Sequence, residues 1–181
     1  MTDINPTTAL ELQHEMSLLA ESDDVHGTLY DLIEQSRFFS DLDRDEIAML
    51  AVWMKAYSAP TGTMLLKEGD ENASLCIIVN GEVNIFKETS HNEHIKIAEI
   101  TKGDSIGEMG VIDGQPLSAS AVTSQDSVVL VITPEGFNNL LEKNSNLGVK
   151  ILLQLSRIIS LRLRHTTRRL ADLLATAKKG K

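Results

Sequence analysis

The sequence predicts a mainly β domain of the α+β class, with helices before and after the strands. Residues 57–133 contain short β-branched runs separated by turns rich in Gly and Asp, a pattern typical of a small barrel or sandwich. The segments on either side carry apolar residues at helical spacing. With 181 residues, 42% hydrophobic and 24% charged, the chain fits one globular domain with additional elements and not a disordered or collagen-like protein.

The first block is expected to be helical. Apolar residues from Leu10 to Leu19 predict a short amphipathic helix at about 7–21, within an N-terminal extension over residues 1–26. A second helix is expected at about 27–36. A third begins at Asp43, because Asp caps helix N-termini and Glu46 three positions later completes a capping box. The sequence leaves open whether the extension packs on the body or serves as a docking peptide.

The strand block contains one strong turn signal. Asn80-Gly81 lies between two β-branched runs and predicts a hairpin, since both positions of such a turn require positive φ. Further strands are expected at about 94–100, 118–124 and 127–132. The single cysteine, Cys76, lies in the apolar run 75–79 and cannot form an internal disulfide, so we expect a small buried hydrophobic residue there.

The third block predicts two more helices. Thr133-Pro134 is a helix N-cap followed by proline at the first helical position. After residue 144 a long helix is expected to reach about residue 175, with apolar residues such as Leu147, Ile151 and Leu155 at steps of three and four. A helix of about 28 residues is about 42 Å long, more than a small domain covers. We therefore expect residues 145–181 to form a dimerisation helix and basic tail that packs against a second copy.

Charge separates this helix from the rest of the chain. The formal net charge is −9, yet residues 145–181 hold nine Lys or Arg and only one acid, Asp172. We expect the cationic helix to lie against the acidic body of its own or a neighbouring chain. A contact of its arginines with nucleic acid or anionic lipid is the alternative. Because the sequence ends soon after this helix, we expect no helix-turn-helix DNA-binding domain.

No segment suggests a membrane protein or an enzyme. Residues 1–6 lack a signal peptide pattern, and no apolar stretch approaches the roughly 20 residues that span a bilayer, so we expect a cytoplasmic protein with no membrane partner. His91 and His94 flank a predicted loop with Glu93, but no spaced set of Cys and His indicates a metal. We expect neither metal nor catalytic residues.

The segment 107–122 is the best candidate for binding chemistry. It contains three glycines, and small hydroxyl residues follow them, so several backbone N–H groups could point at one phosphate. The carboxylate of Glu108 could accept hydrogen bonds from sugar hydroxyls. On these residues alone, a loop without a ligand is equally compatible.

Gly107-Glu108-Met109-Gly110, with Pro116, Ser118 and Ala119 after it, resembles the phosphate-binding cassette of the cyclic nucleotide-binding domain family. The resemblance extends over about 28–175 and includes Phe39-Ser40, Leu42, Glu46, Pro60, Gly62, Glu68-Gly69-Asp70, Ile78 and Gly81-Glu82-Val83. It implies an eight-stranded β-roll, a jelly roll or double-stranded β-helix, over residues 27–144. N-terminal helices flank this roll, and a long C-terminal helix closes over the ligand and often dimerises.

The resemblance also implies a set of ligand-binding residues. Glu108 matches the glutamate that binds the ribose 2′-hydroxyl, and Gly107 and Ser118 match positions that contact sugar or phosphate. On the long helix, Thr166 and Thr167 match hydroxyl residues that reach the purine edge, although two threonines on a helix surface are an equal alternative. The candidate ligand-binding residues are therefore Gly107, Glu108, Met109, Leu117, Ser118, Ala119, Thr166 and Thr167.

One departure from the family pattern bears on the ligand. Where the family has an arginine two residues before Ala119, this chain has Leu117. Arginine offers a permanent charge and a two-pronged donor matched to phosphate oxygens, and leucine offers neither. The loss weakens phosphate binding by about 10–150-fold unless another cation replaces it. We expect such compensation from Arg164 or Arg168, or from a second subunit.

The expected function is a non-catalytic regulatory module that senses a nucleotide-like ligand, a cyclic nucleotide or a related compound, with altered or weakened phosphate recognition. It would signal through a partner protein and would hold no other cofactor. The alternative is a ligand-free dimeric interaction or scaffold subunit, which Leu117 favours.

Overall fold

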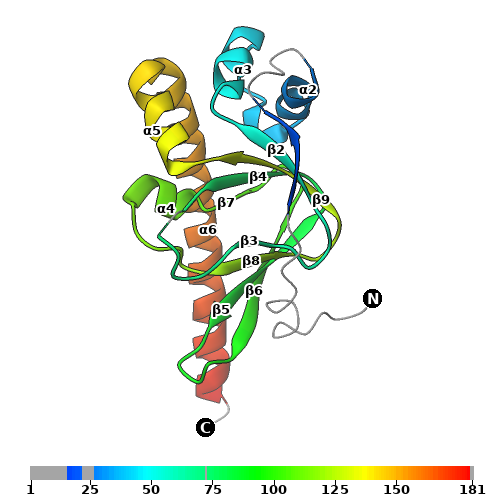
Figure 1. Ribbon diagram of the computed structural model, residues 1–181. Coiled ribbons are helices and arrows are strands. Elements are labelled where there is room, and N and C mark those ends of the chain that lie inside the picture. Colours follow the sequence, from blue (N-terminus) through cyan, green and yellow to red (C-terminus); the bar gives the residue numbers. More distant parts are fainter. Residues whose placement is uncertain (1–15, 22–26, 72, 180–181) are drawn as a thin grey trace.

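The computed structural model describes residues 16–21, 27–71 and 73–179. Two antiparallel sheets pack face to face, and the long helix α6 runs along one side of both (Figure 1). The five-stranded sheet has the order β1 (Ser17–Ala20), β2 (Lys55–Ala59), β9 (Ser127–Ile132), β4 (Leu75–Asn80) and β7 (Ser105–Ile106). The four-stranded sheet has the order β3 (Met64–Leu66), β8 (Ser120–Thr123), β5 (Glu82–Glu88) and β6 (His94–Thr101). This arrangement confirms the mainly β fold class.

The helices flank the roll. They are α2 (Thr28–Glu34), the 3-10 turn η2 (Arg37–Phe39), α3 (Arg44–Ala51), α4 (Glu108–Asp113), α5 (Pro134–Lys143) and α6 (Ser145–Lys179). The predicted capping box of α3 is confirmed, since Asp43 Oδ1 accepts from the Glu46 N–H at 2.9 Å and Glu46 Oε2 accepts from the Asp43 N–H at 3.2 Å. Thr133 caps α5 by accepting from the Gly136 N–H.

The N-terminal expectation was wrong where the structure describes it. Residues 17–20 form strand β1, not a helix, and pair antiparallel with β2. The edge of β2 offers unpaired backbone groups, and satisfying them outweighs the weak helical spacing of Leu18 and Leu19. Both leucines remain half exposed, so little apolar burial opposes the strand. Residues 7–15 of the expected helix lie outside the described residues.

The predicted hairpin at Asn80-Gly81 was also wrong. Strand β4 pairs with β7 and β9, whereas β5 pairs with β6 and β8, so this turn carries the chain from one sheet to the other. Only Gly81 has positive φ, at +92°, and a Cβ there would lie 2.2 Å from Ser127 Oγ. Close contact with the β8–β9 turn therefore requires glycine here. The hairpin that does form joins β5 to β6 through residues 89–93.

Strand β4 lies at the centre of two apolar layers. Leu75, Ile77 and Val79 face the cluster that α2, α3, α5 and the start of α6 cover. Cys76 and Ile78 face the opposite sheet, in a second cluster between the sheets. Burial of both faces explains why this strand is apolar at consecutive positions instead of alternating.

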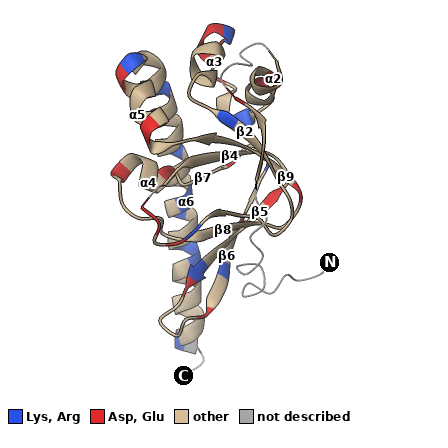
Figure 2. Cartoon of the chain, viewed as in Figure 1, with Lys and Arg blue, Asp and Glu red and all other residues tan. Residues whose placement is uncertain are grey.

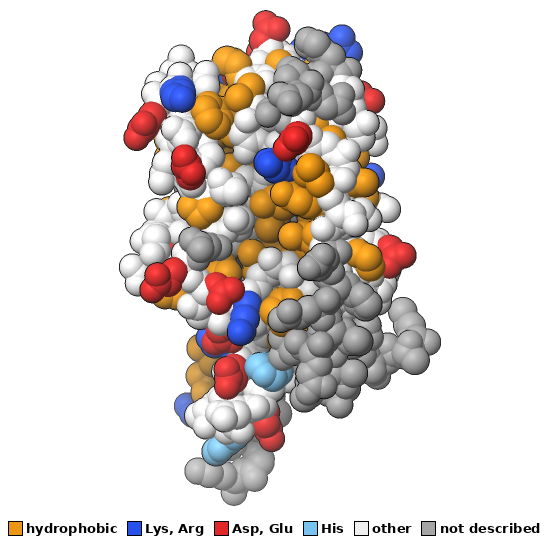
Figure 3. Space-filling view, in the orientation of Figure 1, with side chains coloured by type: hydrophobic (Ala, Val, Ile, Leu, Met, Phe, Trp, Pro, Cys, Tyr) orange, Lys and Arg blue, Asp and Glu red, His pale blue; other side chains and the backbone are white. Residues whose placement is uncertain are grey.

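Helix α6 is longer than the body that it covers. Its 35 residues span about 52 Å. Leu147, Ile151 and Leu155 are buried in the first half, but Leu161 and Leu173 are 67% and 68% exposed in the second. Apolar side chains are visible at the lower left of Figure 3, where Figure 1 places this half of the helix. Among the described helices none is long and apolar enough to cross a membrane.

The thiol of Cys76 is expected to be unreactive in the folded protein. Burial raises the pKa of Cys76 to about 12, so almost no thiolate forms at pH 8. With a chromogenic disulfide reagent at pH 8, the native chain should label at least a hundredfold more slowly than the chain in guanidinium chloride. Rapid stoichiometric labelling of the native chain would show that the inter-sheet cluster opens readily.

Candidate functional site

The predicted cassette, residues 107–119, joins β7 to β8 through α4. Gly107 precedes α4 with φ of +80°, and a Cβ at this position would lie 2.1 Å from the Ser74 carbonyl oxygen. Glycine is therefore required both by the backbone conformation and by the close approach of residue 74. The turn directs the next side chain, Glu108, toward α6.

Glu108 is buried and ion-paired with α6. Its side chain is 6% exposed, and its Oε1 accepts a hydrogen bond from Arg162 Nη1. Arg162 Nη2 donates to the Ser105 carbonyl at 2.6 Å, so one guanidinium joins α6 to both β7 and α4. The second carboxylate oxygen, Glu108 Oε2, is buried and has no hydrogen-bond partner among the described residues, and neither does Ser105 Oγ. The site thus contains a buried acceptor that a hydroxyl donor would satisfy.

Leu117 faces the interior of the roll. It is 6% exposed and belongs to the apolar cluster between the sheets, with Ile78, Val83 and Ala121. Its N–H donates to the Asp70 carbonyl and its carbonyl accepts from the Gly69 N–H, each at 2.9 Å. These two bonds fix the side chain inside the cluster, so an apolar surface occupies the position where the family pattern has a cation.

A second ion pair lies beside the cassette. Lys87 Nζ donates to the Ser118 carbonyl at 2.7 Å and also pairs with Glu68. Burial raises the pKa of Glu68, but hydrogen bonds from the Glu88 N–H and from Lys87, with the Lys87 charge, outweigh burial and hold this pKa below its usual value. Glu68 is therefore ionised at neutral pH, and it neutralises Lys87.

The remaining cassette residues line the surface. Met109 is half exposed, Ser118 is exposed, and Ala119 is partly buried. Within the described chain the Ser118 hydroxyl has no hydrogen bond, and its backbone carbonyl is taken by Lys87. Gly107, Glu108 and Ser118 thus lie in one loop, but only Glu108 has its functional group directed into a buried contact.

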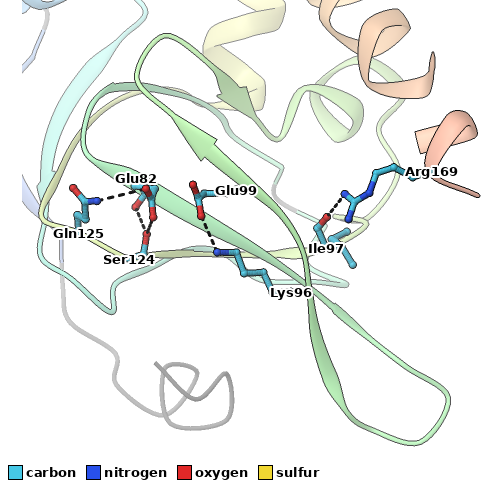
Figure 4. A network of polar contacts seen from close by, with 7 residues as sticks. All are labelled: Glu82, Lys96, Ile97, Glu99, Ser124, Gln125 and Arg169. Atoms are coloured by element: carbon cyan, nitrogen blue, oxygen red, sulfur yellow. Dashed lines mark hydrogen bonds and ion pairs between the residues drawn. The ribbon is translucent and has the colours of Figure 1, made fainter. Parts of the chain in front are cut away.

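On α6, Thr166 and Thr167 differ in direction. Arg162 and Arg169 both reach the roll, and Arg169 Nη1 donates to the Ile97 carbonyl of β6 at 3.1 Å (Figure 4). Thr166 is one turn after Arg162 and so lies on this roll-facing side. Thr167 is rotated by about 100° from Thr166 and lies on the adjacent side. Both threonines are exposed.

The cationic helix does pair with acids of its own chain, as expected. Cations recur along α6 (Figure 2), and Lys150 pairs with Glu46, while Arg157 lies 3.9 Å from Asp41. Arg164 and Arg168, which we expected to compensate for Leu117, form no ion pair or hydrogen bond with any described residue.

Sequence reasoning missed Arg162 and Lys87 as site residues. Arg162 had one available signal, its spacing of four from Thr166. Lys87 had none, because its neighbours Glu68 and Ser118 are brought together only by the sheet pairing. Among the described residues no group of three or more His, Cys, Asp or Glu is placed to hold a metal, and His91 and His94 stay at the β5–β6 hairpin.

Comparisons with known proteins agree with this geometry. The family model for the cyclic nucleotide-binding domain matches residues 57–144. The crystal structure of a cyclic nucleotide-binding domain from Methylobacillus flagellatus is 31% identical, covers 90% of this chain and 93% of that one, and superposes with a TM-score of 0.74. An uncharacterized NTE family protein of Mycobacterium tuberculosis is 30% identical over 120 residues, 66% of this chain. The chain spans only 20% of that curated relative.

A more distant solved structure shares the fold. The regulatory subunit of a cAMP-independent protein kinase A from Trypanosoma cruzi, solved bound to guanosine, is 24% identical and superposes with a TM-score of 0.55. The alignment covers 62% of this chain and 40% of that one, and shows a shared fold. From its two-sheet roll, its cassette and its near full-length similarity to the Methylobacillus domain, the chain belongs to the cyclic nucleotide-binding domain family.

Proposed function

We propose that this chain is a non-catalytic regulatory module that senses a nucleotide-like ligand at the cassette and signals to a partner protein through α6. We place it in the cytoplasm, which its single buried cysteine favours. The observation that carries the proposal is Glu108, buried with one oxygen on Arg162 of α6 and the other without a partner. The candidate binding residue Glu108 is thus in direct contact with α6, the helix through which we propose that the chain signals.

The contact suggests how the signal would pass. A ligand hydroxyl that donates to Glu108 Oε2 changes the charge distribution around the carboxylate that holds Arg162. Arg162 in turn holds α6 against β7 through the Ser105 carbonyl. Ligand binding therefore shifts the balance between positions of α6, and a partner protein reads the exposed half of the helix.

A second function, a ligand-free dimeric scaffold, is favoured by Leu117. Its side chain fills part of the inter-sheet cluster and supplies no charge for a phosphate. In this alternative the cassette is a structural loop, and α6 alone provides the interaction.

We further propose that α6 forms a homodimer. Nine residues at alternating steps of four and three are all exposed and form an outer seam opposite the buried face: Val149, Leu153, Ser156, Ser160, Leu163, Thr167, Leu170, Leu174 and Ala177. This spacing is the a/d repeat of a coiled coil. Five of the nine are large and apolar, and each is at least 53% exposed. A second copy would cover them.

The positions beside the seam favour a parallel pair. One flank carries four cations and one alanine, Lys150, Arg157, Arg164, Ala171 and Lys178, and the other carries Leu152, Ile159, Thr166 and Leu173. A parallel pair sets the cationic flank of one helix against the uncharged flank of the other, whereas an antiparallel pair sets cation against cation. Lys150 and Arg157 already pair with Glu46 and Asp41, so the repulsion that disfavours an antiparallel pair comes from Arg164 and Lys178.

The ligand-sensing function predicts stabilisation by a small ligand. A panel of nucleosides, nucleotides and cyclic mono- and dinucleotides at millimolar concentration should contain a compound that raises the Tm, because a ligand at 100 times its Kd stabilises the folded state by about 2.7 kcal/mol. The Glu108→Gln variant keeps the shape but loses the charge, and should reduce that shift. Differential scanning fluorimetry makes both measurements. If no compound shifts the Tm, the scaffold function is the correct one.

The dimer predicts a difference between two exposed leucines. Leu170→Glu puts a charge into the seam and should weaken the dimer at least tenfold, because the charge would be buried without a partner. Leu161→Glu is the matched control, since Leu161 is more exposed and lies outside the seam. Light scattering after size exclusion, over a dilution series, measures both. Equal effects of the two substitutions, or a monomeric native chain, would exclude the seam.

A further inference from the structure

We infer that the ligand of this cassette is an uncharged nucleoside, not a cyclic nucleotide, and that Glu108, held by Arg162, accepts a hydrogen bond from its sugar hydroxyls. The inference rests on the proposed ligand-sensing function and specifies the chemical class that this same site accepts. Two properties of the site carry it, the balance of charge around the cassette and the buried oxygen of Glu108 that has no partner.

The cations that contact the cassette are already neutralised. Arg162 pairs with Glu108, and Lys87 pairs with Glu68, whose pKa is held below its usual value. A cyclic phosphate entering this site would have to separate one of these pairs or remain an unpaired charge. Each course carries a desolvation cost that a neutral ligand avoids.

Arg164 and Arg168 do not change this balance. Both are exposed, and within the described part of the chain neither contacts the cassette through a hydrogen bond or ion pair. Leu117, at the position of the family's phosphate-binding arginine, is apolar and buried. A phosphate beside it would lose water without gaining a cationic donor from this side chain, a cost that an uncharged group avoids.

The free oxygen of Glu108 selects for a donor. A carboxylate oxygen accepts hydrogen bonds only, so it attracts a hydroxyl and repels an anion. Glu108 is 5% exposed, so Oε2 is away from bulk solvent and its unmet hydrogen-bonding capacity favours a ligand that brings a donor into the site. A ribose hydroxyl satisfies Oε2 while Arg162 keeps Oε1, and no existing ion pair has to break.

The test compares matched pairs of compounds on the full chain. Isothermal titration with adenosine and cAMP, and with guanosine and cGMP, should give at least tenfold tighter binding for the nucleoside of one pair. The 2′-deoxynucleoside of that base should bind at least tenfold more weakly than the nucleoside, because it leaves Glu108 Oε2 without a donor. Both results would support the inference.

The Leu117→Arg variant should reverse the selectivity. An arginine is too polar to remain in the inter-sheet cluster, so its guanidinium should turn toward the cassette, and the affinity for the cyclic nucleotide should rise by about 10–150-fold while the nucleoside affinity changes little. Leu117→Met is the matched control, since it keeps an apolar side chain of similar size and should retain the native selectivity. A fold check by circular dichroism accompanies both variants.

The possible failures are distinguishable. If cAMP or cGMP binds the native chain as tightly as its nucleoside or more tightly, the nucleoside inference is wrong but the ligand-sensing function stands. If neither nucleosides nor cyclic nucleotides bind the native chain or the Leu117→Arg variant, both are wrong and the scaffold function remains. Equal binding of the 2′-deoxynucleoside would overturn the role assigned to Glu108.

Discussion

The ion pair between Arg162 and Glu108 ties the long helix to the roll. Without it, the second half of α6 would contact the body mainly through Arg169 and the Ile97 carbonyl, which is a single exposed hydrogen bond. Glu108 is buried but Arg162 is 34% exposed, so losing Arg162 would leave a buried carboxylate without its cation, whereas losing Glu108 would leave a cation that water can solvate. The buried leucine and isoleucine side chains of the first half hold the start of α6 in the core, and this contact holds its second half against the roll.

The cassette can make that contact because of how tightly its first residue packs. Gly107 lies against the Ser74 carbonyl, so the chain turns sharply and Glu108 enters the roll instead of pointing to solvent. Leu117 closes the other end of the cassette inside the apolar cluster, held by backbone bonds to residues 69–70. Between these fixed ends the loop keeps one buried carboxylate and contributes no cation.

The two faces of α6 have separate roles. One face carries Leu147, Ile151 and Leu155 into the core and then Arg162 and Arg169 to the roll. The other face carries the exposed heptad seam, which the roll does not cover. Under the proposed function, a change at Glu108 of α4 would reach the outer seam through Arg162 on the first face. Sensing and interaction can therefore share a single element.

Local patterns in the sequence were sufficient to predict many of the helices and strands of this molecule. The capping box at Asp43, the N-cap at Thr133 and the long C-terminal helix follow from residue types and spacing, because hydrogen bonds between near neighbours determine them. The positions of the strands after residue 94 follow from β-branched runs between turn residues, although their pairing does not. The cassette was likewise recognisable from a short motif, but the burial of Glu108 was not, because it depends on Arg162 and Ser105.

The remaining features of the fold and the site depend on contacts between residues that are distant in sequence. The Asn80-Gly81 turn has hairpin residues, yet its strands pair with β7, β9, β6 and β8, which no local pattern encodes. β1 replaced a helix because β2 offered an open edge. The neutralisation of Lys87 by Glu68, and of Glu108 by Arg162 across 54 residues, arises where separate elements meet. The charge balance at a site therefore depends on the tertiary structure, since Coulomb attraction acts through space and not along the chain.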